Sequence, residues 1–264
     1  MEYEIKKLSP FRLMSMYAYE ALGPGHNMYA QIDLDITGIR KRLRLLRMEG
    51  QKVSLFGFLL SSIAKTIDEN KELNHIRCGK KIYCFDEVDI FTAIELKHDG
   101  VPIPRIYVVR DAAKKSMSEI TLEIEHAKKR SQITGTIGSN DEWGKEQTKL
   151  VSAFPKWLIK FMVRRFYKNP FKIKEMFGTT YVTSVSGFSD VPGYVMPFFE
   201  GQHRPMAFAI GNIGKKPAVV GSEIHIREFL SMTISFNHDL VDGVPAARFV
   251  NRLKQRIEGI EAIQ

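Results

Sequence analysis

The chain has 264 residues, of which 44% are hydrophobic and 26% charged, and it carries a formal net charge of +9 at pH 7. These fractions are typical of a globular protein with an ordinary buried core, and we expect a single domain over residues 1–264. The amino terminus is charged at once and no apolar run could cross a bilayer, so we expect neither a signal sequence nor a membrane span. Cys78 and Cys84 give neither a disulfide framework nor paired metal-ligand spacing. The sequence therefore indicates a cytoplasmic protein without a bound metal.

The excess of positive charge favours one of three partners: nucleic acid, an anionic membrane surface or an anionic small ligand. The basic residues are spread along the chain, and none of the usual nucleic-acid-binding motifs is present. We therefore expect no nucleic-acid partner.

The first half of the chain alternates between helical and strand patterns. Ser54 precedes an apolar run as a helix N-cap, and Ser116-Met117-Ser118-Glu119 forms a capping box at the start of another helix. The elements expected here are helices over 13–22, 36–47, 55–69 and 117–129 and strands over 28–34, 81–85, 88–96 and 101–109, with a turn at 98–100.

Residues 131–178 interrupt this regular pattern. A polar, glycine-containing stretch over 131–150 is expected to be mobile, and the segment 154–168 then mixes aromatic with basic residues at helical spacing. Two interpretations stay open for 154–168: a helix that docks on its own domain or on a neighbouring subunit, or an interfacial helix on an anionic membrane. We favour docking, because basic-aromatic helices commonly cover apolar surfaces of their own protein.

The second half reads as strands followed by a final helix. The expected strands are 178–188, which ends in a glycine turn, 206–213, 217–220, 223–227 and 232–236, with turns at 212–214 and 220–222 and an amphipathic helix from Pro245. Between the last strand and this helix lies His238, with Asp242 and Gly243 shortly after it. A histidine at a strand end can act as a general base near neutral pH, although it is more often a structural residue.

The residues that flank this histidine indicate a protein family. Residues 235–249, Ser-Phe-Asn-His-Asp-Leu-Val-Asp-Gly-Val-Pro-Ala-Ala-Arg-Phe, resemble the carboxy-terminal signature of the dihydrolipoyl acyltransferase catalytic domain of 2-oxoacid dehydrogenase complexes. Residues 178–188 resemble the Gly-Thr-Phe-Thr-Ile-Ser-Asn-Leu-Gly phrase of that family, with Ser184 on its serine. The resemblance covers nearly the whole chain and is weakest over 131–178.

The resemblance implies a fold like that of chloramphenicol acetyltransferase: an α/β two-layer sandwich in which helices pack on one side of a mixed β-sheet. It also implies roles for three residues. His238 is the general base that takes the proton of the attacking thiol, Ser184 donates a hydrogen bond to the oxyanion, and Asp242 braces the loop. Chloramphenicol acetyltransferase pairs an amino-terminal arginine with the motif aspartate, so Arg12 and Asp242 form a candidate ion pair.

The implied function is CoA-dependent transfer of an acyl group between a thioester and a thiol, either dihydrolipoyl or CoA, or to a hydroxyl or amine. Coenzyme A is then a substrate, and a homotrimer or larger assembly is expected, because the family's histidine faces a serine of a neighbouring subunit. No lipoyl module or Ala/Pro-rich linker is recognised in the sequence, so we expect a free-standing form that meets lipoyl groups only in trans. Asp239 stands where the lipoyl enzymes usually have arginine. The contrasting hypothesis is a non-catalytic scaffold or membrane-surface protein of the same fold.

Overall fold

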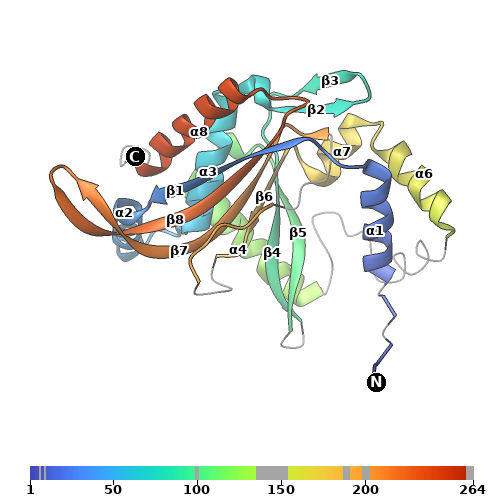
Figure 1. The fold of residues 1–264 in the computed structure, drawn as a ribbon. Helices are drawn as coiled ribbons and strands as arrows, with labels where there is room; N and C mark the ends of the chain where they lie inside the picture. The colour runs from blue at the N-terminus through green and yellow to red at the C-terminus, as the bar shows by residue number, and fades with distance from the viewer. Residues whose placement is uncertain are drawn as a thin grey trace.

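A six-stranded mixed sheet organises the chain (Figure 1). The computed structural model describes residues 1–5, 7–8, 10–98, 101–134, 154–186, 191–197 and 203–259. The strand order is β1-β8-β7-β6-β4-β5, and β2 and β3 form a separate two-stranded sheet. The strands are β1 (Asn27–Asp35), β2 (His75–Cys78), β3 (Lys81–Cys84), β4 (Ile90–His98), β5 (Val101–Val109), β6 (Thr180–Ser184), β7 (Met206–Val220) and β8 (Glu223–Asn237).

The central strand β6 gives the sheet its mixed character. It pairs in parallel with β4 on one side and with β7 on the other, whereas every other pair in the sheet is antiparallel. Parallel neighbours need long connections: β5, α4 (Met117–Thr134), α6 (Lys156–Phe166) and α7 (Pro170–Phe177) lie between β4 and β6 in the chain, and residues 185–205 lie between β6 and β7. The predicted mixed sheet is therefore confirmed.

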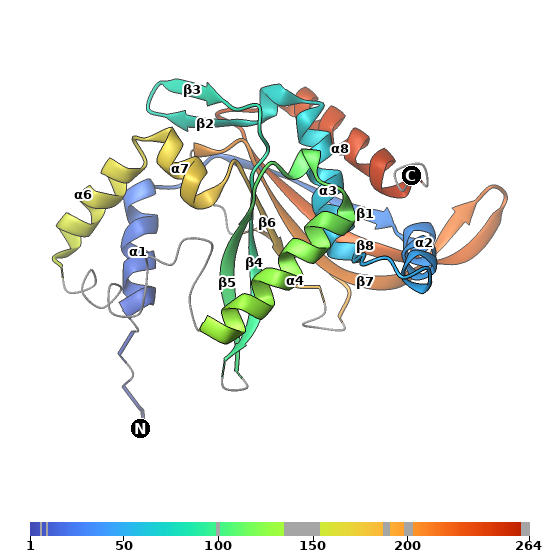
Figure 2. The same cartoon turned by 180° about the vertical axis from the view of Figure 1, so that it is seen from behind.

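Helices cover one face of this sheet, as the two opposite views show (Figures 1 and 2). Phe249 of α8 lies against Phe208 of β7 and Phe236 of β8, with ring centroids 6.0 and 6.1 Å apart. These aromatic contacts join the helical layer to the sheet, so the predicted two-layer sandwich is confirmed. The covering helices are α2 (Thr37–Met48), α3 (Leu55–Asp68), α4 (Met117–Thr134) and α8 (Gly243–Glu258).

The predicted helix starts have the capping bonds that their sequences require. The Ser54 hydroxyl accepts the backbone N–H of Gly57 at 2.9 Å, so it caps α3. At the start of α4, the Ser116 hydroxyl accepts the N–H of Glu119 at 3.2 Å, and the Glu119 carboxylate accepts the N–H of Ser116 at 2.8 Å. These bonds satisfy N–H groups that have no partner inside the helix.

The long hairpin of β7 and β8 corrects the predicted series of short strands. A turn was expected at 212–214, but β7 continues through it to Val220, with a register shift between Ile210 and Ile213. An extra residue is accommodated there as a bulge, and Gly211 allows it, since a Cβ at this position would lie 2.4 Å from the carbonyl oxygen of Gly193. The expected turn at 220–222 is present, with Gly221 at φ +65°.

The chain also has elements that the sequence pattern did not indicate. The four-residue strand β2 and the helix α7 (Pro170–Phe177) were not predicted. The expected turn at Asp99 and Gly100 and most of the polar stretch 131–150 lie outside the described residues. None of the helices in the described part of the chain combines the length and apolar character needed to cross a membrane.

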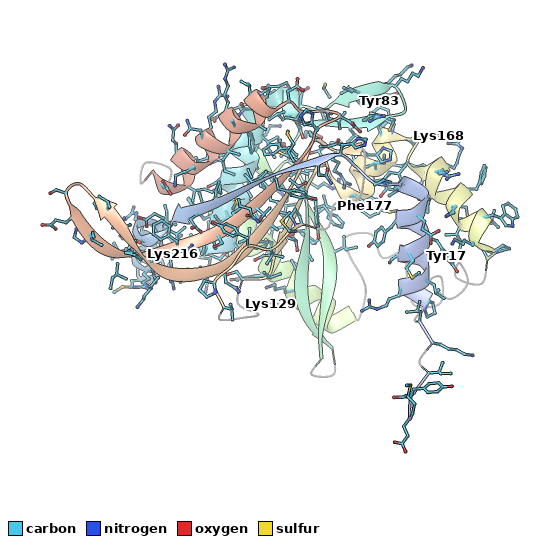
Figure 3. All side chains as sticks on the ribbon, viewed as in Figure 1. Tyr17, Tyr83, Lys129, Lys168, Phe177 and Lys216 are labelled. Carbon is cyan, nitrogen blue, oxygen red and sulfur yellow. The ribbon has the colours of Figure 1, made fainter. Side chains whose placement is uncertain are left out.

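At one end of the molecule, α1 (Pro10–Leu22) and α6 (Lys156–Phe166) pack together beside α7 (Figures 1 and 2). Lys156 and Lys160 of α6 both pair with the carboxylate of Glu20 at 2.8 Å. Tyr17 lies on α1 (Figure 3), with the ammonium of Lys156 5.3 Å from its ring centroid. The atypical segment therefore contacts the rest of its own chain, as the docking interpretation expects.

Candidate active site

His238 follows the last residue of β8 and is exposed. Its backbone N–H donates to the carbonyl of His26 at 2.7 Å, which fixes the loop against the residue just before β1. The N–H groups of Leu240 and Val241 both donate to the carbonyl of Asn237 at 3.0 Å, so the chain turns back within the loop. The structure thus presents the histidine on a tight, hydrogen-bonded loop at the end of a central strand.

Asp242 ends this loop as the N-cap residue of α8, with extended backbone angles of φ −80° and ψ 165°. Its carbonyl accepts the N–H of Ala246 at 3.2 Å, but its exposed carboxylate makes no capping bond to the helix. In the described part of the chain, the Asp242 carboxylate has neither a hydrogen bond nor an ion pair. Bracing by this side chain would therefore need a group from outside the described chain.

The expected ion pair between Arg12 and Asp242 does not form within this chain. Arg12 lies in the first turn of α1, at the end of that helix far from β1, whereas Asp242 lies at the start of α8 (Figure 1). The physical reason is the direction of α1, whose carboxy-terminal end, not its first turn, leads toward the sheet and the His238 loop.

Asp239 stands at the position where the resembling family usually has arginine, and it has two partners in the structure that can carry positive charge. Its carboxylate lies 3.0 Å from Nδ1 of His26 and 3.4 Å from a terminal nitrogen of Arg77. The hydrogen bond with His26 and the positive charge of Arg77 hold the pKa of Asp239 below its usual value, although burial acts in the opposite direction. Sequence reasoning missed His26 and Arg77, because they are 213 and 162 positions from Asp239 and no local pattern marks them.

Ser184 is the last residue of β6 and is half-buried. Its hydroxyl accepts the N–H of Ser186 at 3.2 Å. The N–H of Val185 donates to the carbonyl of Ile210 at 3.0 Å, which keeps the chain on the sheet just past the strand end. The serine is thus held by backbone pairing in a central strand.

The strand register keeps Ser184 and His238 apart within one chain. Ser184 lies opposite Ile210 of β7, which lies opposite Met232 of β8. From Met232 to His238 the chain advances six residues along β8, which corresponds to about 20 Å. The intervening strand β7 adds roughly 10 Å across the sheet. The register therefore keeps Ser184 and His238 of one subunit too far apart for their side chains to meet.

A buried carboxylate supports the strand that carries Ser184. Asp89, 2% exposed, accepts hydrogen bonds at 2.9 Å from both Arg110 and the N–H of Asp111, and Lys174 of α7 lies 3.1 Å from it. Burial alone would lower the pKa of Lys174, but hydrogen bonds to Glu87 and Asp89 raise it above its ordinary value. The network fastens α7, the element just before β6, to the start of β4, the parallel neighbour of β6.

No group of three or more His, Cys, Asp or Glu side chains in the described ranges is arranged to hold a metal ion. The proposed chemistry needs none, since a base and a hydrogen-bond donor suffice for transfer between thiols.

Comparison with known proteins connects this geometry to a family. Residues 159–264, which include Ser184 and His238, match the family model of the 2-oxoacid dehydrogenases acyltransferase (catalytic domain). The chain is 21% identical over 216 residues to the lipoamide acyltransferase component of the branched-chain alpha-keto acid dehydrogenase complex of Bacillus subtilis, covering 81% of the chain and 41% of that protein. It is 24% identical over 242 residues to the succinyltransferase component of the 2-oxoglutarate dehydrogenase complex of Bartonella vinsonii, covering 89% and 48%. The chain spans less than half the length of these relatives.

Solved structures agree over the whole chain. The dihydrolipoamide acetyltransferase of Azotobacter vinelandii superposes with a TM-score of 0.70 at 16% identity, covering 99% of this chain and 94% of that one. The cubic core of a pyruvate dehydrogenase multienzyme complex gives 0.68 at 15% identity, with 99% and 94% covered. The fold is that of the acyltransferase catalytic domain. Chloramphenicol acetyltransferase shares this fold. It superposes with a TM-score of 0.50 at 12% identity, covering 97% of this chain and 100% of that one.

The resemblance inferred from the sequence is thus confirmed, and with it the predicted fold. The Azotobacter acetyltransferase was investigated for the role of a serine, a histidine and an asparagine in its catalytic mechanism, with the asparagine four positions after the histidine. In this chain Asp242 stands four positions after His238. The single-domain organisation, the free-standing form and the cytoplasmic location stay predictions.

Proposed function

We propose that this protein is a CoA-dependent acyltransferase that moves an acyl group between a thioester and a thiol acceptor. The observation that carries the proposal is the exposed His238, which a tight loop holds at the end of β8 in the part of the chain that matches the acyltransferase model. A scaffold would not require an exposed histidine and a strand-end serine at the positions of the family motif.

The chemistry uses two side chains. His238 takes the proton of the attacking thiol, and the thiolate forms a new C–S bond to the thioester carbonyl carbon. The Ser184 hydroxyl donates a hydrogen bond to the oxyanion of the tetrahedral intermediate. When the intermediate collapses, the original C–S bond breaks and the departing thiolate takes the proton back from His238. Protons and electrons balance without a covalent acyl-enzyme.

We further propose that the working form is a homotrimer or a larger assembly with its active sites between subunits. The distance between His238 and Ser184 along the sheet supports this arrangement, because each group needs a partner from another copy. The fold is shared with the cubic core of a pyruvate dehydrogenase complex, which is an assembled protein. Each active site would combine His238 of one subunit with Ser184 of the next.

The acceptor is proposed as a dihydrolipoyl group in trans or CoA itself, with a hydroxyl or an amine as the alternative. The test measures release of CoA from acetyl-CoA and longer acyl-CoAs, with dihydrolipoamide as acceptor, for wild type and His238→Ala. Turnover that disappears in the variant supports the proposal. Turnover that survives the substitution removes His238 from the mechanism, and the absence of turnover with every donor and with thiol, hydroxyl and amine acceptors would favour the scaffold hypothesis.

A second proposal concerns α6, which we assign to peripheral contact with an anionic lipid surface. Trp157 and Phe161, one helical turn apart, are 69% and 62% exposed, while Ile159 on the inner face is 2% exposed. The charged residues of the segment 154–174 are all basic; Lys156 and Lys160 pair with Glu20, and Lys174 pairs with Glu87 and Asp89. Lys168 lies just past the carboxy-terminal end of α6 (Figure 3). Exposed aromatic rings beside cations are typical of helices at the membrane interface. A second copy of the same surface would meet it with like charge, which disfavours self-association through this face.

The lipid proposal is tested by co-sedimentation with vesicles of phosphatidylcholine alone or mixed with phosphatidylserine. Binding should require the anionic lipid, weaken with salt and fall at least fivefold in Trp157→Ala/Phe161→Ala. The matched control is Ile224→Ala/Ile226→Ala on the hairpin, where both residues are equally exposed at 76% and 77%. Absence of salt-sensitive binding, or a loss of trimer in the α6 variant, would contradict the proposal.

A further inference from the structure

Three residues from separate parts of the chain meet beside the His238 loop. His26 directly precedes β1, Arg77 lies in β2, and Asp239 follows His238. The Asp239 carboxylate lies 3.0 Å from the imidazole of His26 and 3.4 Å from the guanidinium of Arg77. We call this group the Asp239 bridge.

Arg77 is itself held in place, so it can serve as a fixed point for the loop. Its Nε donates to the carbonyl of Gly79 at 3.0 Å, and its own carbonyl lies 2.8 Å from Nδ1 of His203. The guanidinium is therefore oriented by the β2–β3 turn before it reaches Asp239. A charge-assisted contact from an oriented arginine is more directional than one from a free surface lysine.

His26 holds the loop in two ways. The pairing of β1 with β8 ends at Asn27 and Asn237, and beyond this pair the carbonyl of His26 still accepts the backbone N–H of His238. The imidazole of the same residue then contacts Asp239. The contact between β1 and β8 thus continues past the end of the sheet. A main-chain hydrogen bond holds His238, and a side-chain contact holds Asp239, the next residue.

Asp239 also turns the loop locally, since its N–H donates to the side-chain oxygen of Asn237 at 3.0 Å. An arginine at this position, which the resembling lipoyl enzymes usually have, would repel Arg77 instead of pairing with it. In this chain the carboxylate of Asp239 instead attracts Arg77 and ties the loop to β2.

We infer that Asp239 is a positioning residue, which sets the orientation of His238 by tying its loop to His26 and Arg77. The inference rests on the proposed function for its catalytic consequence, but the tie itself is a property of the fold. Misplacement of a reacting group by about 1 Å can cost on the order of 100-fold in rate, so loss of an exposed tie should cost less, roughly tenfold.

The first test compares kcat and KM for acyl-CoA in wild type, Asp239→Asn, Arg77→Gln and the double variant. Asp239→Asn weakens the contacts with both His26 and Arg77 and should lower kcat about tenfold with little change in KM, and Arg77→Gln removes one of these contacts and should cost less. The double variant should lose no more than Asp239→Asn, because Arg77 acts on the loop through Asp239. Asp239→Glu should recover part of kcat. The matched control is Glu223→Gln, which breaks an exposed carboxylate–histidine pair of 3.2 Å with His225 at the hairpin tip. Multiplicative losses in the double variant, or an equal loss in the control, would overturn the inference.

The second test does not depend on turnover. Amide hydrogen exchange of residues 238–241, measured by mass spectrometry, should become about tenfold faster in Asp239→Asn and stay unchanged in Glu223→Gln. If wild type turns over no acyl-CoA, the proposed function fails, yet faster exchange in Asp239→Asn still supports the tie. Unchanged exchange in Asp239→Asn would overturn the inference whatever the activity.

Discussion

Ser184 ends β6 and His238 follows β8, two strands of one sheet. The residue of β8 that lies level with Ser184 is Met232, six residues before His238. This offset corresponds to about 20 Å along the strands, far beyond the reach of two side chains. A catalytic histidine must reach the attacking thiol, and an oxyanion donor must reach the carbonyl that this thiol attacks, so both must lie beside the same reacting atoms. If these two residues act together as proposed, the site must therefore combine His238 of one subunit with Ser184 of another.

Replacement of the proposed base should affect rate and not folding. His238→Ala is expected to lower kcat for CoA release by about 100-fold to 10,000-fold, the range for loss of a general base. Because His238 is exposed, the melting temperature should change little. The matched control is His225→Ala, also an exposed histidine, which should keep full activity. Equal losses in the two variants would show that the effect is not specific to the site.

Loss of the buried carboxylate at Asp89 should destabilise the fold. Asp89→Ala leaves Arg110 and Lys174 without their shared anion, so we expect a loss of about 3 kcal/mol in the free energy of unfolding. Urea unfolding measures this value. The control Asp68→Ala breaks only an exposed pair of 3.9 Å with Lys71 and should cost less than about 1 kcal/mol. Similar costs for both variants would contradict the structural role of the network.

Acid should destabilise the protein partly through His75. Burial lowers the pKa of His75 below its unfolded value of 6.5, even though a hydrogen bond with the carbonyl of Glu72 acts to raise it. Below about pH 6.5, His75 therefore binds a proton more readily in the unfolded chain than in the folded chain, so the free energy of unfolding decreases as the pH falls. His75→Gln should flatten this loss between pH 7 and 5 in thermal melts, whereas the exposed His126→Gln should not. An unchanged slope in His75→Gln would contradict the prediction.

Gly178 links α7 to β6 and should tolerate no side chain. Its φ is +62°, and a Cβ there would lie 2.5 Å from the carbonyl oxygen of Asp89. Gly79 has a similar φ of +61° but nothing within 4 Å, so Gly79→Ala measures the cost of a side chain at positive φ without a close contact, about 1 kcal/mol. Gly178→Ala should cost at least about 2 kcal/mol more in urea unfolding. Equal costs would show that the close contact is relieved by a small shift.

Local patterns in the sequence predicted much of the fold. The strand expected over 101–109 has the bounds of β5, and the caps at Ser54 and Ser116 mark where α3 and α4 start. Each of these signals acts within a few residues of the element that it defines. The turn expected at 212–214 was wrong, because glycine and asparagine there accommodate a bulge and the long-range pairing with β8 outweighs their turn preference.

The sequence predicted which residues form the candidate site but not which residues they contact. The family motif indicates His238 and Ser184, yet the expected pair of Arg12 with Asp242 is absent, because its formation depends on where α1 lies. The partners of Asp239 lie in β2 and just before β1, and only the folded chain brings them together. Tertiary contacts of this kind leave no periodic or spaced signal in the sequence.

The most direct test of the account is complementation between two inactive variants. His238→Ala and Ser184→Ala should each be nearly inactive alone, but subunits mixed by co-expression should form sites that take His238 from one subunit and Ser184 from the other. With random assembly, half of the histidines meet half of the serines, so about a quarter of wild-type CoA release should return. Activity that stays at the level of the single variants, in assemblies shown to be mixed, would contradict an active site shared between subunits.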